Sequence, residues 1–159
     1  MIPDRHKKKA AWLAICLGCT ASAEGIRQTA YRDPAPAGNW TYCFGETRHP
    51  DGRPVRAGDH ATRAECEALL EGRLFEFGAA VDKCTTVELP PARKAAMTDF
   101  AYNEGAARYC KYIAPQLNAG KTREACDHLL RFNTAGGVVF PGLTKRREVE
   151  RGLCLEGLA

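Results

Sequence analysis

Residues 24–47 read EGIRQTAYRDPAPAGNWTYCFGET, and this stretch decides how the rest of the chain is interpreted. It places one carboxylate, Glu24, nine positions before a second, Asp33, and a Gly- and Pro-rich loop and a short strand-like segment follow. Two carboxylates on opposite sides of a turn, with the hydroxyl of Thr41 nearby, are the groups that cleavage of a glycosidic bond requires. One acid protonates the leaving oxygen, and the other group holds a water or stabilises the developing sugar cation.

Length and composition limit the classes of protein that this chain can belong to. It has 159 residues, enough for one domain with its own core, and its hydrophobic content of 45% excludes a disordered protein. The net charge of +4 is mild, and the densest basic cluster, residues 5–9, is not interleaved with aromatic side chains. We therefore expect no nucleic-acid partner, whereas a mild positive charge favours approach to an anionic cell wall.

The motif around Glu24 resembles that of the phage lysozymes of glycoside hydrolase family 24, the lambdoid endolysins especially. In those proteins a glutamate closes the first helix in E-G-x-R-x-x-x-Y-x-D, and G-x-W-T begins a hairpin. Three further segments are similar to family motifs in the expected order: Gly38 to Thr41, Ala101 to Gly105 and Pro141 to Glu148. Two features depart from the pattern. The segment from Asp33 to Thr41 is longer, through Pro34 to Ala37, and Glu46 stands where many members have histidine.

The resemblance implies an α+β, predominantly helical fold with two lobes: a small β-hairpin lobe, a long connecting helix and a helical C-terminal lobe. It also implies an endolysin, a muramidase that hydrolyses the β-1,4 bond between N-acetylmuramic acid and N-acetylglucosamine of peptidoglycan with inversion. No cofactor is needed for this reaction, and we expect a monomer.

The catalytic residues that the resemblance implies are Glu24, Asp33 and Thr41. Glu24 is the general acid, because partial burial at the end of an apolar helix favours its protonated form. Asp33, helped by Thr41, holds the attacking water, and the two carboxylates of an inverting pair stand roughly 6.5–9.5 Å apart. Each residue also has a structural interpretation: a solvated helix end for Glu24, a turn residue for Asp33 and a strand residue for Thr41.

Four further residues are candidates for substrate binding: Asn103, Tyr31, Trp40 and Arg146. Asn103 lines the cleft, fixes the geometry between the lobes or belongs to a helix end. Tyr31 and Trp40 flank the sugar path or pack in the core. Arg146 meets substrate carboxylates through paired hydrogen bonds or belongs to a salt-bridged helix surface. The four histidines show no ligand spacing, so we expect no metal site.

The N-terminal residues follow the pattern of an export signal, with basic residues 5–9 before a largely apolar run, residues 10–23. As a helix this run is about 21 Å long, against the roughly 30 Å of a bilayer core. Three interpretations are open: a signal-arrest-release segment, an amphipathic first helix that never enters a membrane, and a cleaved signal peptide. We favour the first, in which residues 1–23 carry the protein to the host periplasm and residues 10–23 tether it transiently to the inner membrane. Residues 24–159 then form the catalytic domain.

Eight cysteines in this chain are hard to explain in a reducing cytosol. Six lie in the presumed catalytic body, and spacing alone leaves their connectivity open. The order of the elements, with the resemblance to cysteine-bearing lambdoid endolysins, favours the pairs Cys43–Cys66, Cys84–Cys110 and Cys126–Cys154. The other two, Cys16 and Cys19, lie in the apolar run. We expect them to stay reduced in the membrane and to pair or exchange with body cysteines after release.

Helix signals account for most of the chain after the hairpin. Thr62-Arg63-Ala64-Glu65 is a capping box that opens a long helix, and apolar residues recur at helical spacing as far as Val81. Pro90-Pro91 begins a helix that Gly105 ends. Further helices are expected near residues 108–117, 122–132 and 142–155.

Two other functions are alternatives to the muramidase: a lytic transglycosylase and a non-catalytic binding protein. A lytic transglycosylase needs one acid/base and no carboxylate to hold a water, so Asp33 with Thr41 argues against it. A non-catalytic cationic protein that binds the wall or a membrane tolerates the loss of both Glu24 and Asp33.

Overall fold

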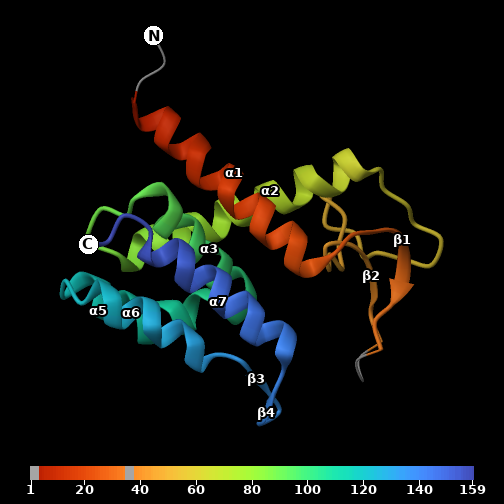
Figure 1. The fold of residues 1–159 in the computed structure, drawn as a ribbon. Helices are drawn as coiled ribbons and strands as arrows, with labels where there is room; N and C mark the ends of the chain where they lie inside the picture. Colours follow the sequence, from red (N-terminus) through yellow and green to blue (C-terminus); the bar gives the residue numbers. More distant parts are fainter. Residues whose placement is uncertain (1–3, 35–37) are drawn as a thin grey trace. The chain divides into compact units, whose positions relative to one another are not determined.

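A computed structural model describes residues 4–34 and 38–159 of the chain. Residues 35–37, which carry most of the expected insertion, lie outside the described residues. The chain forms two compact units: a large unit (Met1–Cys19 and Arg73–Ala159) and a small unit (Thr20–Gly72). Helices α1 (Asp4–Glu24) and α2 (Arg63–Cys84) each run from one unit into the other (Figure 1). The fold is α+β and predominantly helical, as the sequence predicted.

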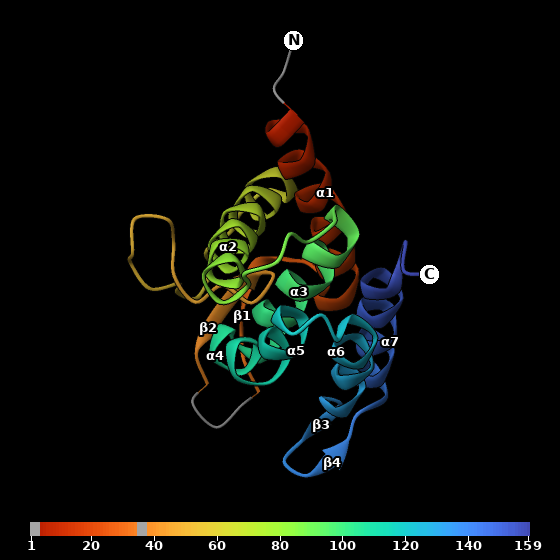
Figure 2. The same cartoon turned by 90° about the vertical axis from the view of Figure 1, so that its left-hand side faces the viewer.

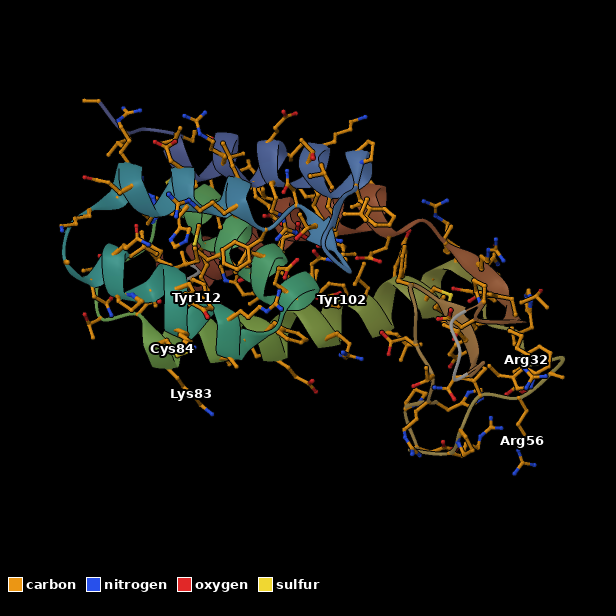
Figure 3. All side chains as sticks on the ribbon, turned by 90° about the horizontal axis from the view of Figure 1, so that it is seen from below. Arg32, Arg56, Lys83, Cys84, Tyr102 and Tyr112 are labelled. Atoms are coloured by element: carbon orange, nitrogen blue, oxygen red, sulfur yellow. A yellow bond between two sulfur atoms is a disulfide. The ribbon has the colours of Figure 1, made fainter. Side chains whose placement is uncertain are left out.

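The small unit is built on an antiparallel hairpin of β1 (Arg27–Arg32) and β2 (Trp40–Cys43). Tyr31 pairs with Thr41 across the ladder, and Arg32 pairs with Trp40. A long loop follows β2, and the bridge between Thr29 and His60 brings its end back beside β1. Arg32 and Arg56, which are labelled in Figure 3, extend from the hairpin and from this loop.

The start of α2 confirms the predicted capping box. Glu65 Oε2 accepts hydrogen bonds from the Thr62 amide at 2.7 Å and from the Thr62 hydroxyl at 2.9 Å. In return, the Glu65 amide donates to Thr62 Oγ1 at 3.2 Å. Two of the orphan amides at this helix end are therefore satisfied. A disulfide from Cys43 to Cys66 ties the end of β2 to the first turn of the helix.

The large unit is a helical bundle around one core. Its main helices are α3 (Pro91–Glu104) and α7 (Pro141–Leu155), which pack against each other (Figures 1 and 2). Shorter segments complete the unit: α4 (Ala106–Arg108), the π-helical turn η1 (Tyr109–Ile113), α5 (Ala114–Asn118), α6 (Thr122–His128) and the 3₁₀ turn η2 (Leu129–Arg131). The fully buried side chains of this core include Val81, Met97, Phe100, Ile113 and Leu129.

Disulfides also link the elements of the large unit. Cys84, labelled at the end of α2 in Figure 3, pairs with Cys110, and Cys126 of α6 pairs with Cys154 of α7. Together with Cys43–Cys66, these are the pairs that the sequence analysis favoured. Cys16 and Cys19 belong to none of the three.

The structure differs from the sequence prediction in two segments of the large unit. The helix expected over residues 108–117 is divided, because Pro115 has no amide to donate to residue 111 and the ladder shifts to a π turn before it. A second hairpin, β3 (Thr134–Ala135) and β4 (Val138–Val139), was not predicted. Gly136 and Gly137 connect its strands with φ of 57° and 80°, which suits a tight turn of the primed type.

Of the helices in the described chain, none is both long and apolar enough to cross a membrane. Within residues 4–34 and 38–159, no three side chains of His, Cys, Asp or Glu are placed to hold a metal ion. The predicted division at residue 24 concerns export of the chain and stays a prediction.

Candidate active site

Glu24 is the last residue of α1. Gly25 follows it with φ of 69°, a conformation that glycine adopts readily, and its amide donates to the Ala21 carbonyl at 3.2 Å. The chain therefore leaves the helix directly after Glu24. We expected partial burial of this side chain, but the structure leaves it exposed, because the helix ends there and the chain turns away into β1.

A cavity of about 190 Å³ lies next to Glu24 within the small unit. Tyr31 and Phe44 give it aromatic walls, and the Arg27 guanidinium lies 4.4 Å from the centroid of the Tyr31 ring. Cys43, also in its wall, has φ of 55°, which costs a non-glycine residue about 1–3 kcal/mol and is typical of functional sites. The cavity thus combines a carboxylate with flat apolar surfaces, the combination that a sugar ring requires.

Asp33 and Thr41 lie at the loop end of the hairpin, where β1 connects to β2. The Asn39 carbonyl accepts a hydrogen bond from the Asp33 amide at 2.9 Å and another from the Thr41 hydroxyl at 3.3 Å. Asp33 is half-buried, and Thr41 is 3% exposed. One carbonyl oxygen therefore fixes both residues, even though the segment between them is longer than the family pattern.

The two aromatic candidates lie at different cavities. Tyr31 shares the cavity of Glu24, whereas Trp40 lines a second cavity of about 170 Å³ with Arg48, Val55 and their neighbours. Because Tyr31 and Trp40 are both half-buried, neither belongs wholly to the core. Their predicted contacts with the sugar path stay a prediction.

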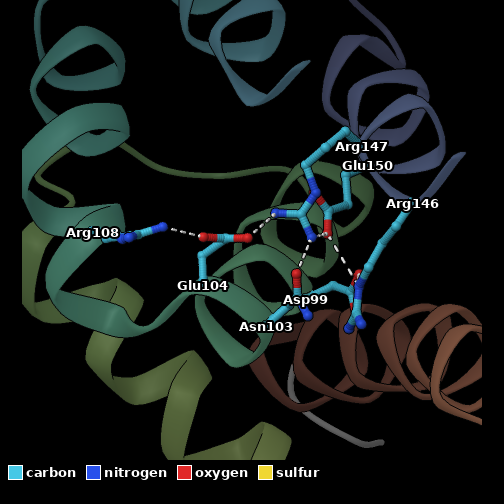
Figure 4. Close-up of polar contacts among 7 residues, drawn as sticks. All are labelled: Asp99, Asn103, Glu104, Arg108, Arg146, Arg147 and Glu150. Carbon is cyan, nitrogen blue, oxygen red and sulfur yellow. Dashed lines mark hydrogen bonds and ion pairs between the residues drawn. The ribbon is translucent and has the colours of Figure 1, made fainter. Parts of the chain in front are cut away.

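Arg146 and Asn103 belong to a buried ionic cluster of the large unit (Figure 4). Arg146 holds Asp99 with two hydrogen bonds, Nη2 to Oδ1 at 2.8 Å and Nε to Oδ2 at 3.1 Å. Its side chain is 7% exposed, so the salt-bridged helix surface weighed for Arg146 is wrong: the pair lies between α3 and α7. Substrate binding by Arg146 stays a prediction, and in this structure its guanidinium binds the Asp99 carboxylate.

Asn103 contacts a second arginine of the same cluster. Its Oδ1 accepts a hydrogen bond of 2.6 Å from Arg147 Nη2, and Arg147 also lies 3.0 Å from Glu150. Arg147 and Glu150 are fully buried. Burial raises the pKa of Glu150 well above its usual value, against the opposing charge of Arg147, and burial lowers the pKa of Arg147. Asn103 is thus a structural partner of α7.

One cluster of polar residues in the small unit was missed by the sequence analysis. Tyr42, His49 and Asp59 form a hydrogen-bonded chain of side chains. His49 and Asp59 lie in the long loop after β2, and no periodic pattern in the sequence marks them. The structure therefore brings Glu24, Asp33, Thr41 and Tyr31 into one unit, together with this chain, and places Asn103 and Arg146 in the other.

Comparisons with known proteins agree with this architecture. The sequence model described as phage lysozyme matches residues 21–150. A SAR-endolysin of Bacteriophage PS119 is 36% identical over 135 residues, which are 84% of this chain and 77% of that protein. The structure of an endolysin from phage FAHEc1 of Escherichia coli O157:H7 superposes with a TM-score of 0.81 at 28% identity and covers 91% of this chain and 92% of its own.

A P22 lysozyme mutant is similar in structure as well, with a TM-score of 0.79, 28% identity and coverage of 88% of this chain and 94% of its own. The matched residues include the helix end at Glu24, the hairpin with Asp33 and Thr41, all of α3 and the first ten residues of α7. This chain therefore belongs to the phage lysozyme family.

Proposed function

We propose that the chain is an inverting muramidase in which Glu24, Asp33 and Thr41 are the catalytic residues. That it is an endolysin, which hydrolyses the β-1,4 bond between N-acetylmuramic acid and N-acetylglucosamine for host cell lysis, follows from its family. The observation that carries the choice of residues is the shared Asn39 carbonyl, which fixes Asp33 and Thr41 in the same unit as Glu24.

In this mechanism, Glu24 gives its proton to the glycosidic oxygen as the bond from that oxygen to C1 breaks. A water attacks C1 from the opposite face and passes its proton to Asp33. The Thr41 hydroxyl donates to the Asn39 carbonyl, so its lone pairs accept a hydrogen from the same water. The product is a reducing sugar end of inverted configuration, and no cofactor enters the reaction.

The first prediction concerns Glu24. Replacement of Glu24 by Gln removes the proton donor but keeps the size of the side chain, so we expect lysis of purified cell walls to fall by about 10²–10⁴-fold with folding unchanged. Turbidity of a wall suspension measures the rate. Glu76→Gln, an exposed glutamate of α2, is the matched control and should keep the wild-type rate.

Other variants and the products separate the remaining alternatives. Asp33→Asn should lose lysis as well, and NMR of the first product should show the inverted anomer. An anhydro-muramic end would indicate a transglycosylase, and retained configuration would contradict inversion. If Glu24→Gln and Asp33→Asn both lyse walls as fast as wild type, the proposed catalytic residues are wrong.

We also propose that the protein is exported to the host periplasm and is held at first in the inner membrane by residues 10–23. Curated relatives carry the name SAR-endolysin, and the run follows a basic cluster. In the folded large unit, Trp12 and Cys16 of this run are buried. The apolar side chains therefore have a place in the protein when they are not in lipid.

The second prediction tests the tether with Ala14, which is exposed on α1. Ala14→Arg places a charge in the apolar run, which costs about 2.5–3.5 kcal/mol for insertion in a membrane, without filling a buried site. We expect the variant to leave the membrane fraction of host cells and to keep its activity on purified walls. Ala14→Leu is the control and should stay in the membrane fraction.

Intact mass of the protein from each fraction completes this experiment. A mass that retains residues 1–23 excludes the cleaved signal peptide, and equal fractionation of Ala14→Arg and wild type would contradict the tether. Mapping of cysteines under non-reducing conditions in the same fractions tests the expected change at Cys16 and Cys19. Identical thiol states in both fractions would reject that change.

A further inference from the structure

Three side chains that the proposed mechanism does not use form a continuous chain in the small unit. The Tyr42 hydroxyl lies 3.1 Å from His49 Nδ1, and His49 Nε2 lies 2.7 Å from Asp59 Oδ2. Because a carboxylate only accepts hydrogen bonds, Nε2 carries the hydrogen and donates it to Asp59. In the tautomer that carries its hydrogen on Nε2, Nδ1 accepts from the Tyr42 hydroxyl.

Asp59 is held firmly at the outer end of this chain. Its Oδ2 also accepts from the Arg56 amide at 2.8 Å, and its main-chain oxygen accepts from the Ala30 amide of β1 at 2.8 Å. The hydrogen bond from His49, followed by that from the Arg56 amide, lowers the pKa of Asp59 below its usual value, so the carboxylate is ionised at neutral pH. The chain therefore connects β2 to β1 by a route outside the ladder.

The inner end of the chain lies directly beside a proposed catalytic residue. Tyr42 follows Thr41 in β2, and successive side chains of a strand point to opposite faces. Tyr42 is 2% exposed, with its ring centroid 5.0 Å from that of His49. Fixing Tyr42 on one face of β2 therefore fixes the rotation of the strand, and with it the direction of Thr41 on the other face.

We infer that His49 is a positioning residue for the reaction: held by Asp59, it fixes Tyr42 and so aims the Thr41 hydroxyl at the attacking water. This inference rests on the proposed catalytic role of Thr41. It assigns a function to the loop between residues 49 and 59, which supplies both His49 and Asp59 and otherwise only connects β2 to α2.

The test removes the Tyr42 hydroxyl and compares the effect on activity with that of removing a second buried tyrosine hydroxyl. Tyr42→Phe keeps the ring and loses only the hydrogen bond to His49. Tyr109→Phe is the control, because Tyr109 is also fully buried, and its hydroxyl makes one side-chain hydrogen bond, to Thr85 at 2.5 Å. Both variants lose one buried hydrogen bond, so we expect similar decreases in Tm.

Only Tyr42→Phe should change catalysis. We expect its kcat on soluble glycan fragments to fall about 10- to 100-fold, as for a misplaced catalytic group, with KM unchanged because Thr41 orients a water and not the sugar. His49→Ala should show the same loss. His49→Gln should restore most of kcat, since its amide oxygen accepts from Tyr42 and its amide nitrogen donates to Asp59.

Two outcomes would overturn the inference. In one, Tyr42→Phe keeps the kcat of the Tyr109→Phe control, and in the other its effect lies entirely in KM. The activity of Glu24→Gln is measured in the same assay. It separates an error in the role of His49 from an error in the proposed catalytic residues. An inactive Glu24→Gln beside a fully active Tyr42→Phe contradicts the role of His49 alone, whereas an active Glu24→Gln contradicts the catalytic residues themselves.

Discussion

At the scale of single residues, burial decides what each ion pair contributes. Two arginines of α7 each hold an aspartate of the large unit: Arg146 holds Asp99, and Arg151 holds Asp127 at 2.6 Å. The first pair is 7% and 3% exposed, and the second is 37% and 46% exposed. Water therefore solvates the second pair but not the first, although the two have the same chemistry.

This difference gives the third prediction. Asp99→Ala leaves the Arg146 guanidinium buried without its bidentate partner, so we expect the free energy of unfolding to fall by about 3–5 kcal/mol. Asp127→Ala removes an exposed partner and should cost about 0–1 kcal/mol. Urea denaturation of both variants measures the two values. Equal losses would mean that water reaches the Arg146 pair, contrary to its burial.

The burial of these residues could not be predicted from the sequence. Arg146 precedes Glu150 by one helical turn, and this spacing is identical in a solvated salt-bridged helix and in a buried cluster. Only the packing of α3 against α7 separates the two, and that packing depends on residues far away in the sequence. The motif predicted catalytic roles for Glu24, Asp33 and Thr41, and these stay predictions. It indicated neither the exposure of Glu24 nor the hydrogen-bonded chain from Tyr42 to Asp59.

At the scale of elements, local signals were the most reliable. The capping box at Thr62 was predicted because its hydrogen bonds join residues only three positions apart. The β3–β4 hairpin was missed because strands of two residues are too short to show an alternating pattern. The Gly136-Gly137 pair between Thr134-Ala135 and Val138-Val139 was the signal available in the sequence.

The fourth prediction concerns the start of α2. Thr62→Ala removes the side chain that accepts from the Glu65 amide, so we expect a loss of about 0.5–2 kcal/mol in the free energy of unfolding. The hydrogen bonds from the amide and the hydroxyl of Thr62 lower the pKa of Glu65. Glu65 therefore stabilises the fold above its unfolded pKa, and this contribution is lost as pH falls through the lower folded value.

The free energy of unfolding, measured over a range of pH, separates the contribution of the Glu65 carboxylate from that of the Thr62 hydroxyl. Stability of Glu65→Gln should decrease less than that of wild type between about pH 5 and pH 3, because the variant has no carboxylate to protonate there. Glu67→Gln, two residues further along the same helix, serves as the comparison. If wild type and Glu65→Gln lose stability in parallel, the reciprocal box does not form in solution.

At the scale of the whole molecule, each disulfide closes a loop inside one unit. The cysteines of the Cys126–Cys154 bond are 28 residues apart in the sequence of the large unit. Those of Cys43–Cys66 are 23 residues apart in the small unit. Loops of this length restrict the unfolded chain strongly, which is how a disulfide stabilises a fold in the chain-entropy account. An oxidising compartment is where such bonds persist.

The fifth prediction follows from this arrangement. Replacement of Cys126 and Cys154 together by Ala should lower the free energy of unfolding by about 3–4 kcal/mol. Calorimetry in the absence of reductant measures the change, and wild type with dithiothreitol should lose at least as much. A double variant with unchanged Tm would show that packing of α6 on α7 already holds this part of the large unit.

The large unit is built from two segments that are separated in the sequence, and this affects the order in which its parts are synthesised. Residues 1–19 are translated before the small unit, but the rest of their own unit begins only at residue 73. During that interval the nascent chain presents Trp12 before Gly78 and Lys94, which lie against its ring in the finished fold, have been made. For the export that we propose, this order leaves the emerging helix accessible to the export machinery before its final packing forms.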